Sequence, residues 1–240
     1  MDTVPAALVF DVMGTVVDDR GGVRGATLTV LERRGDDHEA ALAVASGTAE
    51  RQTALMKEVS SGARPWASHR ALRRTAVREA VEAAGLAPLE QADEDELSGV
   101  VHRFEPWPDS PDALDRLRTD HVVVALTNAD PAELAGFSRR GGLAWHLGLS
   151  TRPSGAYKPD PRAYAVAVEA LELEPGEIMM VAAHPWDLRA AARTGMRTCY
   201  VRRPGEEPAP EGEFDLEVDD LHALADALDA VVDRSEDGAR

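Results

Sequence analysis

Four short apolar runs, each followed by polar residues, are the feature that most constrains the fold of this chain. They cover residues 6–10, 121–126, 178–181 and 198–201. The runs are continuous rather than alternating, which is typical of parallel strands that are covered on both faces. Stretches with helical spacing lie around the last three runs, at residues 112–119, 131–140, 161–171, 186–194 and 219–232. Strand alternating with helix predicts an α/β fold with a doubly wound, Rossmann-like parallel sheet.

Residues 16–103 have a different character, because they contain no strand-like run and are rich in Ala, Arg and Glu. Three segments there have features of helices, the last of them least regular, at residues 49–59, 68–84 and 93–102. We therefore predict an α-helical cap at 16–103, inserted after the first strand. The predicted catalytic core then consists of residues 1–15 and 104–240.

The composition excludes several classes of partner. Acidic residues outnumber basic ones by 43 to 26, and the net charge of −17 argues against nucleic acid or an anionic membrane. No apolar run approaches the roughly 20 residues that span a bilayer, and the N-terminus lacks the basic start of a secretory signal. The single cysteine, Cys199, can form neither an internal disulfide nor a cysteine-based zinc site. We therefore expect a cytoplasmic protein.

Chemistry-bearing residues gather at the predicted strand ends. Lys158 stands out among them, because the chain has only two lysines beside 24 arginines. The carboxyl ends of parallel strands meet at one edge of a sheet, so we expect the clusters to form a single site. They centre on Asp11, on Thr127 and Asn128, on Lys158, and on His184 and Asp187.

Together, these four clusters and the helical insertion resemble the haloacid dehalogenase superfamily over nearly the whole chain. Phosphatases of that superfamily carry a second Asp two residues after the nucleophile, whereas this chain has Met13, which cannot transfer a proton or approach Mg²⁺. Metal-dependent members have an acidic pair where this chain offers Asp187 alone. The chain therefore resembles the type II (S)-2-haloacid dehalogenases, and the resemblance implies no metal and no cofactor.

This resemblance implies a reaction in two steps. Asp11 displaces halide from C2 of an (S)-2-haloacid and forms an ester, which water hydrolyses to the (R)-2-hydroxy acid. Lys158 is expected to pair with Asp11, and Asp187 to orient or activate the water. Members of the family are often dimers, so a homodimer that acts on a small 2-substituted carboxylic acid is expected.

The substrate carboxylate and the oxyanion need hydrogen-bond donors. We expect the N–H groups around Val12 and Met13 to serve one of them, and Thr127 to bond either Asp11 or the substrate carboxylate. The resemblance places Arg51 and Asn128 at the leaving halide, although Arg51 also fits an exposed helix charge.

Two aromatic residues complete the predicted pocket, and the chain differs from many family members at two further positions. Tyr164 matches the tyrosine after the family's lysine motif, and Trp66 is the expected cap aromatic, with packing as the alternative role of each. Many dehalogenases have Ser and Asn where this chain has Ala182 and His184. His184 either replaces the Asn as a hydrogen-bonding group or changes the substrate.

Three other functions compete with dehalogenation. The nearest is ester chemistry on another small 2-substituted acid, for example azetidine-2-carboxylate, where His184 can assist the leaving amine. A phosphatase that tolerates Met13 is less favoured, because the acid/base residue is missing. A non-enzymatic binding protein is least favoured, because it has no chemical reason to keep Asp11, Lys158 and Asp187 together.

Overall fold

A six-stranded parallel sheet forms the centre of the molecule. The structure is a computed structural model and describes residues 4–237, so the predicted core's residues 1–3 and 238–240 lie outside the described part. The strand order is β3-β2-β1-β4-β5-β6. The strands are β1 (Ala7–Phe10), β2 (Val122–Thr127), β3 (Leu147–Ser150), β4 (Ile178–Ala182), β5 (Arg197–Val201) and β6 (Leu216–Val218). The predicted α/β class and the parallel sheet are confirmed.

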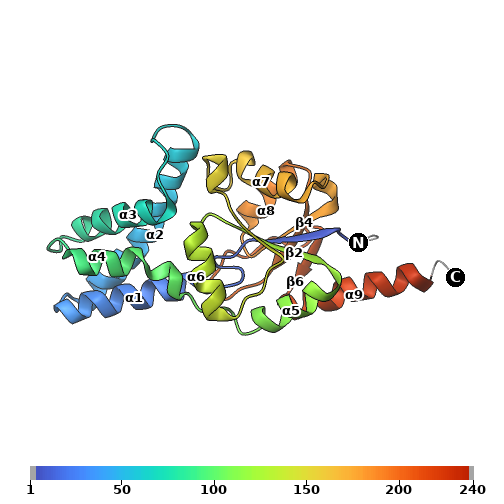
Figure 1. Cartoon of the computed structure of the whole chain (residues 1–240). Helices are drawn as coiled ribbons and strands as arrows, with labels where there is room; N and C mark the ends of the chain where they lie inside the picture. Colours follow the sequence, from blue (N-terminus) through green and yellow to red (C-terminus); the bar gives the residue numbers. More distant parts are fainter. Residues whose placement is uncertain (1–3, 238–240) are drawn as a thin grey trace.

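Helices cover both faces of this sheet. Side chains along a strand point alternately to opposite faces. Leu8 and Phe10 of β1 belong to the core beneath α5 (Ser110–Asp120), α6 (Pro131–Gly141) and α9 (Leu221–Asp237). Val9 belongs to the opposite core, with α7 (Pro161–Leu171) and α8 (Pro185–Arg193). Figure 1 shows α7 and α8 above the sheet and α5 and α9 below it.

The register of the central strands creates one functional edge. Phe10, the last residue of β1, lies opposite Ala125 of β2 and Val181 of β4. The residues that follow these three strands therefore emerge beside one another. Asp11 comes directly after β1, in the middle of the sheet.

Strands β3 and β6 were not predicted. Each lies at an edge of the sheet and pairs with one neighbour, β2 or β5. β3 contains Gly148, and only Ser150 of its four residues is buried. An edge strand that is partly exposed does not need the continuous apolar sequence that marks a buried strand.

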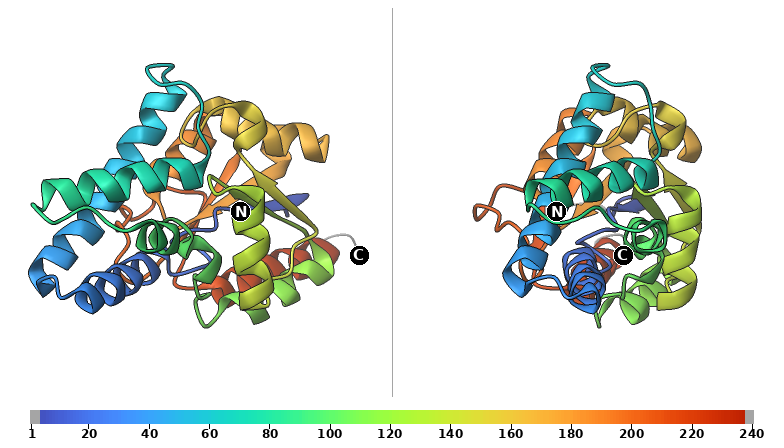
Figure 2. Two further views of the ribbon diagram at one scale, coloured as in Figure 1. Left: turned by 60° about the vertical axis from the view of Figure 1, so that its left-hand side comes forward. Right: turned by 90° about the vertical axis from the view of Figure 1, so that its left-hand side faces the viewer.

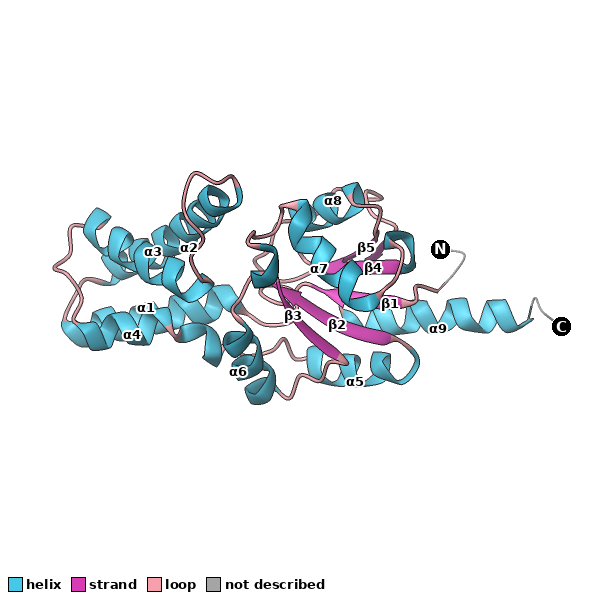
Figure 3. Ribbon diagram, turned by 45° about the horizontal axis from the view of Figure 1, so that its top comes forward, coloured by secondary structure: helices cyan, strands magenta, loops and turns pink. Residues whose placement is uncertain are grey.

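The insertion after β1 consists of helices within the described residues. They are α1 (Asp19–Arg34), α2 (His38–Ser60), α3 (His69–Ala83), α4 (Gln91–Ser98) and the 3₁₀ helix η1 (Val100–Arg103). Helix α1 was not predicted, because three glycines interrupt its apolar pattern. Helix α2 begins at His38, well before the predicted start at residue 49, and the Asp37 side chain caps its first amides. Figures 2 and 3 show these helices as a body beside the sheet.

This helical body, the cap, is docked onto the core. The Tyr157 hydroxyl donates to the Ala67 carbonyl at 2.7 Å, across the boundary between cap and core. His69 Nδ1 lies 2.8 Å from Glu133 Oε2, and both side chains are buried. The Asp130 carboxylate accepts from the Arg70 amide at 3.1 Å. The start of α3 is therefore fixed against the loops that follow β2 and β3.

Among residues 4–237, no helix combines the length and the apolar character needed to cross a membrane.

Candidate active site

A buried lysine ammonium lies between two buried carboxylates at the carboxyl edge of the sheet. Lys158 Nζ is 2.8 Å from Asp11 Oδ1 and 2.7 Å from Asp187 Oδ2. Asp11 follows β1, whereas Asp187 lies in the first turn of α8, directly after the neighbouring strand β4. All three side chains are almost completely excluded from solvent. The structure thus brings three predicted catalytic residues into direct contact.

The surroundings give the two carboxylates different basicities. Burial alone would raise the pKa of Asp11, but the charge of Lys158 and the hydrogen bond from His184 hold it well below its usual range. Burial raises the pKa of Asp187, and the negative charge of Asp11 adds to this effect against the attraction of Lys158. Burial opposes the charge of Lys158, yet the two carboxylates raise its pKa. Asp11 therefore suits an ionised nucleophile, and Asp187 is the better proton acceptor.

The second oxygen of Asp11 is also held. Thr15 donates its hydroxyl to Asp11 Oδ2 at 2.8 Å and accepts from the Ala183 amide at 2.9 Å. His184 Nδ1 lies 3.0 Å from the same Oδ2. Thr15 was not among the predicted site residues, although it stands only four residues after Asp11. The Asp11 carboxylate is thus fixed by three side chains.

His184 is itself held between two carboxylates. Its Nε2 lies 3.1 Å from Glu206 Oε2, and the other Glu206 oxygen pairs with Arg20 Nε at 2.9 Å. Burial would lower the pKa of His184, but hydrogen bonds to Asp11 and Glu206 raise it to about 10. The ring is therefore an imidazolium at neutral pH and donates from both nitrogens. Glu206 was missed because it lies in an acidic loop with no motif around it.

Gly14 provides the space that His184 needs. Its φ of +79° lies in the left-handed region that favours glycine. A Cβ there would also stand 2.7 Å from His184 Cε1 and 3.2 Å from Glu206 Oε1. The glycine is thus required both by the backbone and by the approach of His184 to Asp11.

Asn128 positions the lysine through its backbone. Its Oδ1 accepts from the Lys158 amide at 2.8 Å and from the Thr151 hydroxyl at 3.2 Å. Its Nδ2 donates to the Lys158 carbonyl at 3.4 Å. The Asn128 side chain, which was expected at the halide, therefore holds the backbone of Lys158 in this structure.

Thr127 lies at the end of β2 but not against Asp11. Its hydroxyl is fully buried and accepts from the Ala129 amide at 3.1 Å. Within the described residues, the hydroxyl that reaches Asp11 comes from Thr15. Thr127 therefore shapes the turn after β2.

Tyr164 and two backbone amides complete the site. The Tyr164 hydroxyl hydrogen-bonds to Asp187 Oδ1, the oxygen that does not face Lys158. Burial, the largest influence, and the charge of Asp187 raise the pKa of Tyr164 well above its usual range, so the phenol remains a donor. The N–H groups of Val12 and Met13 donate to no acceptor within residues 4–237. These amides are available to a bound carboxylate or oxyanion.

Arg51 and Trp66 lie away from these contacts. Arg51 pairs within the cap with Glu79 and, at 2.7 Å, with Glu58. Trp66 is 39% exposed, and the guanidinium of Arg152 lies 5.2 Å from its ring centre. Neither contacts Asp11 in the described part of the chain. The two acidic partners of Arg51 neutralise the charge that the halide was expected to use.

The cation between the carboxylates of Asp11 and Asp187 is the Lys158 ammonium. Across residues 4–237, no group of three or more His, Cys, Asp or Glu side chains is arranged to hold a metal ion. Lys158 Nζ occupies the point between Asp11 and Asp187.

Comparison with known proteins identifies the family. A family model described as haloacid dehalogenase-like hydrolase matches residues 5–195. The chain therefore belongs to the haloacid dehalogenase-like hydrolases.

Individual relatives point to two chemistries. The chain is 32% identical over 147 residues to (S)-2-haloacid dehalogenase from Pseudomonas sp. (strain YL), an alignment that covers 59% of this chain and 63% of the relative. It is 36% identical over 168 residues to phosphoserine phosphatase from Thermus thermophilus, covering 65% of this chain and 66% of that relative. The alignments thus span slightly less than two thirds of these curated relatives.

A solved structure matches a larger share of the chain. The crystal structure of the L-2-haloacid dehalogenase PA0810 superposes with a TM-score of 0.85 at 33% identity. The match covers 94% of this chain and 99% of that one, so the cap and the core both have counterparts.

Proposed function

We propose that this chain is a metal-independent dehalogenase that converts (S)-2-haloacids to (R)-2-hydroxy acids and halide through an ester on Asp11. The observation that carries the proposal is the single ammonium of Lys158 bridging Asp11 and Asp187. This arrangement supplies an ionised nucleophile and a separate basic carboxylate without a metal ion. The relatives named as (S)-2-haloacid and L-2-haloacid dehalogenases support the same reading.

In the first step, an oxygen of Asp11 attacks C2 from the side opposite the halogen. The C–O bond forms as the carbon–halogen bond breaks, halide leaves with its electron pair, and the configuration at C2 inverts. The contacts with Lys158, Thr15 and His184 fix the carboxylate for in-line attack. The free amides of Val12 and Met13 are suited to hold the substrate carboxylate.

In the second step, water attacks the Asp11 carbonyl carbon rather than C2. Asp187 takes the proton from this water, and Tyr164 and Lys158 hold the two Asp187 oxygens. The tetrahedral intermediate collapses with cleavage of the bond between the Asp11 carbonyl carbon and the ester oxygen, and this oxygen takes up the proton that Asp187 received, which gives the hydroxy acid and regenerates both carboxylates. The product keeps an oxygen that came from Asp11, and Asp11 gains one from water.

A phosphatase reaction fits these residues less well. Met13 stands where an acid/base carboxylate would protonate the leaving alcohol. Phosphoryl transfer also needs cations to neutralise the charge of the phosphate, whereas Lys158 is already neutralised by two carboxylates.

His184 favours one second candidate. As an imidazolium 3.0 Å from Asp11, it can donate a proton to a leaving amine. Ring opening of a cyclic 2-carboxylated amine, such as azetidine-2-carboxylate, uses the same Asp11 ester with a nitrogen leaving group.

The decisive experiment measures halide release from (S)-2-chloropropionate in EDTA, for the wild type and for Asp11→Asn. We expect release of chloride with (R)-lactate from the wild type alone, and none from the (R)-enantiomer. In H₂¹⁸O with enzyme in excess, the label should enter Asp11 and not the product. No release, or release that EDTA abolishes, would contradict the proposal. Azetidine-2-carboxylate, and phosphoserine with Mg²⁺, then test the alternatives.

A further inference from the structure

Arg73 of α3 carries a buried guanidinium that pairs with no carboxylate among residues 4–237. It is only 4% exposed, its Nε is buried without a hydrogen-bond partner, and no ion pair joins it to another residue in the described part of the chain. Its one described contact is with the Phe104 ring, whose centre lies 6.0 Å from the guanidinium carbon. Buried charges are normally paired, because transfer of an unpaired charge out of water is strongly unfavourable.

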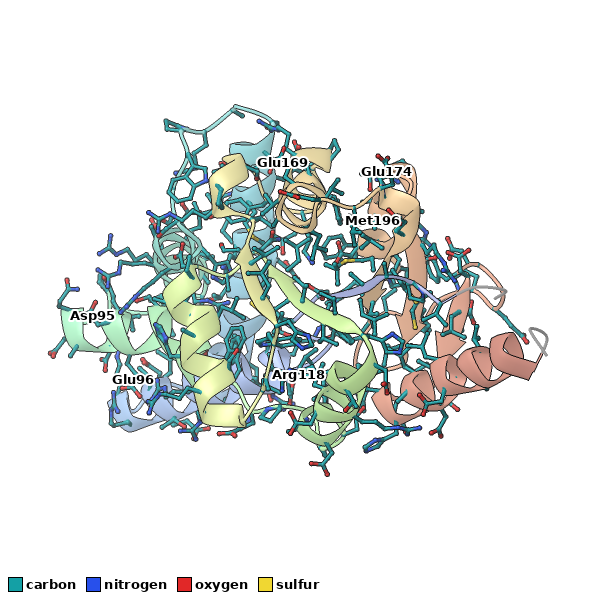
Figure 4. All side chains as sticks on the ribbon, turned by 45° about the vertical axis from the view of Figure 1, so that its right-hand side comes forward. Asp95, Glu96, Arg118, Glu169, Glu174 and Met196 are labelled. Carbon is teal, nitrogen blue, oxygen red and sulfur yellow. The ribbon has the colours of Figure 1, made fainter. Side chains whose placement is uncertain are left out.

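Two other arginines of α3, Arg74 and Arg78, are each paired with a carboxylate. Arg74 pairs with Asp95, which lies at the outer end of the cap (Figure 4). Arg78 forms two hydrogen bonds to Glu94, both of 2.6 Å. The missing partner is therefore particular to Arg73 among these three arginines.

The position of Arg73 directs it toward the core. His69 stands one helical turn earlier on the same face of α3 and contacts Glu133 of the core at 2.8 Å. The Phe104 ring beneath Arg73 packs on Gly22 of α1, where a Cβ would stand only 2.5 Å from the ring. Arg73 thus lies where the chain passes between cap and core.

The charges around Arg73 connect it with the Asp11 site. Burial lowers the pKa of Arg73, and the charges of Glu133 and Asp19 only partly offset this effect. Asp19, whose pKa is raised to about 6 chiefly by burial, interacts in turn with His184 and Asp11. The unpaired guanidinium is therefore within electrostatic reach of residues that surround the nucleophile.

We propose that Arg73 binds a small monovalent anion at the cap side of the Asp11 site. The identity of that anion rests on the proposed function: it is the carboxylate of the 2-haloacid or the departing halide. A guanidinium suits both, because its planar N–H fork matches a carboxylate and its fixed charge attracts a halide. Arg51 cannot serve in the same way while Glu58 and Glu79 neutralise it.

A structural role is the competing explanation. Glu133 Oε1 is buried and has no hydrogen-bond partner within the described residues, so Arg73 can serve to neutralise that carboxylate. The two roles differ in their effect on stability. Removing an unmatched buried cation should not lower the melting temperature in anion-free buffer, whereas removing the partner of Glu133 should lower it.

The test measures binding of unreactive anions, so it does not depend on turnover. Propionate stands for the substrate carboxylate and bromide for the halide, and affinities come from calorimetry and from the shift in melting temperature. The variants are Arg73→Gln, Arg73→Lys, and the matched control Arg74→Gln on the same helix. Arg51→Gln is included because the family resemblance placed the halide there.

We expect Arg73→Gln to weaken anion binding by about ten- to hundredfold, as for the loss of a charge-assisted hydrogen bond. Arg74→Gln and Arg51→Gln should bind as the wild type does. Arg73→Lys keeps the charge but not the fork, so a larger loss for propionate than for bromide identifies the carboxylate as the ligand. Equal losses for both anions would show that the site uses the charge of Arg73 and not its fork, as binding of a halide requires.

Three results would overturn the inference. They are undiminished anion binding by Arg73→Gln, loss of binding in Arg51→Gln instead, and no anion binding by the wild type. Turnover separates this inference from the proposed function. If the wild type binds propionate through Arg73 but releases no halide, the dehalogenase proposal fails while the anion site stands.

Discussion

The charged side chains of the site are buried, and most of them are neutralised by a partner at hydrogen-bond distance. Lys158 serves Asp11 and Asp187 at once, and His184 joins Asp11 to Glu206. Removing one member of any of these pairs should destabilise the folded chain, because the other member would remain charged and desolvated. The pairing therefore links stability to the chemistry of the site.

Replacing Lys158 by Met should show this link. The change leaves Asp11 and Asp187 adjacent without a cation, so the pKa of Asp11 rises and the nucleophile loses its charge. We expect halide release to fall by about 100- to 1000-fold or more. We also expect unfolding to become easier by about 3–5 kcal/mol, measured by chemical denaturation. Lys57→Met, at the only other lysine, removes an exposed side chain and should change neither quantity.

The pairing of His184 should make stability depend on pH. Its pKa rises from an ordinary value of 6.5 to about 10 in the folded chain. Below pH 6.5 the ring is charged in both the folded and the unfolded chain, so its pairing contributes fully. Between pH 6.5 and 10 only the folded chain keeps the proton, and the contribution declines as pH rises.

The measurement is the melting temperature of wild type and His184→Asn across this pH range. The difference between them should be largest below pH 6.5 and should disappear by about pH 10. Glu206→Gln removes one of the two carboxylates, so in that variant the decline should end at lower pH. A difference that is constant with pH would contradict the pairing.

At the scale of elements, the turn after β1 is fixed by segments from distant parts of the chain. The Trp107 indole donates to the Gly14 carbonyl at 3.1 Å, and Arg203 Nε donates to the Thr15 carbonyl at 2.8 Å. Arg203 is in turn held by Asp109 at 2.8 Å. The loop that carries Glu206 thus also secures the turn that carries Thr15.

Gly14→Ala should disturb this arrangement in two ways. The positive φ alone costs about 1–2 kcal/mol for a residue with a side chain. The new methyl group would also displace His184, so halide release should fall and the pKa of His184 should move toward its ordinary value. Gly35→Ala is the matched control, because its φ is +87° and no atom of residues 4–237 outside its own neighbourhood lies within 4 Å of the added Cβ. Gly35→Ala should lose only the stability that the positive φ accounts for and should keep its activity. Chemical denaturation, halide-release assays and a titration of His184 by NMR measure these three quantities in both variants.

At the scale of the molecule, the site depends on the cap remaining against the core. Figure 1 places the cap at one end of the sheet and both termini at the other. The junction between cap and core includes the buried pair of His69 and Glu133 and the contacts of Tyr157 with Ser60 and Ala67. Tyr157 directly precedes Lys158, so its contacts join the cap to the segment that carries the lysine. The homodimer and the cytoplasmic location stay predictions.

Tyr157→Phe tests whether this junction holds the cap. The variant loses the bond to the Ala67 carbonyl, and we expect a loss of about 1 kcal/mol in stability. Hydrogen exchange should become faster in residues 61–70, at the junction. Tyr200→Phe loses a comparable bond to the Glu207 carbonyl and serves as the control. Unchanged exchange at 61–70 in Tyr157→Phe would show that other contacts hold the cap closed.

The sequence patterns predicted the central strands of the sheet better than its edge strands. Buried strands must be apolar along their whole length, so the four central strands were visible, whereas edge strands β3 and β6 were not. The cap was correctly seen as helical, but α1 was missed because its glycines weaken the helical pattern. Backbone propensity and apolar spacing are local properties, and they indicate only what a segment does by itself.

The residues after β1 and β4 by themselves indicated that Asp11 and Asp187 lie at one edge of the sheet, because parallel strands bring their carboxyl ends together. Lys158 follows β3, a strand that the sequence patterns did not predict. Only the tertiary structure decided which groups share each charge. It placed Thr15 rather than Thr127 at Asp11, assigned Glu206 to His184 and paired Arg51 with two acids. Among the described residues, it left the Nε of Arg73 without a hydrogen-bond partner. The physical reason is that ion pairs and hydrogen bonds depend on distances of a few ångströms between segments far apart in the chain, which no local pattern encodes.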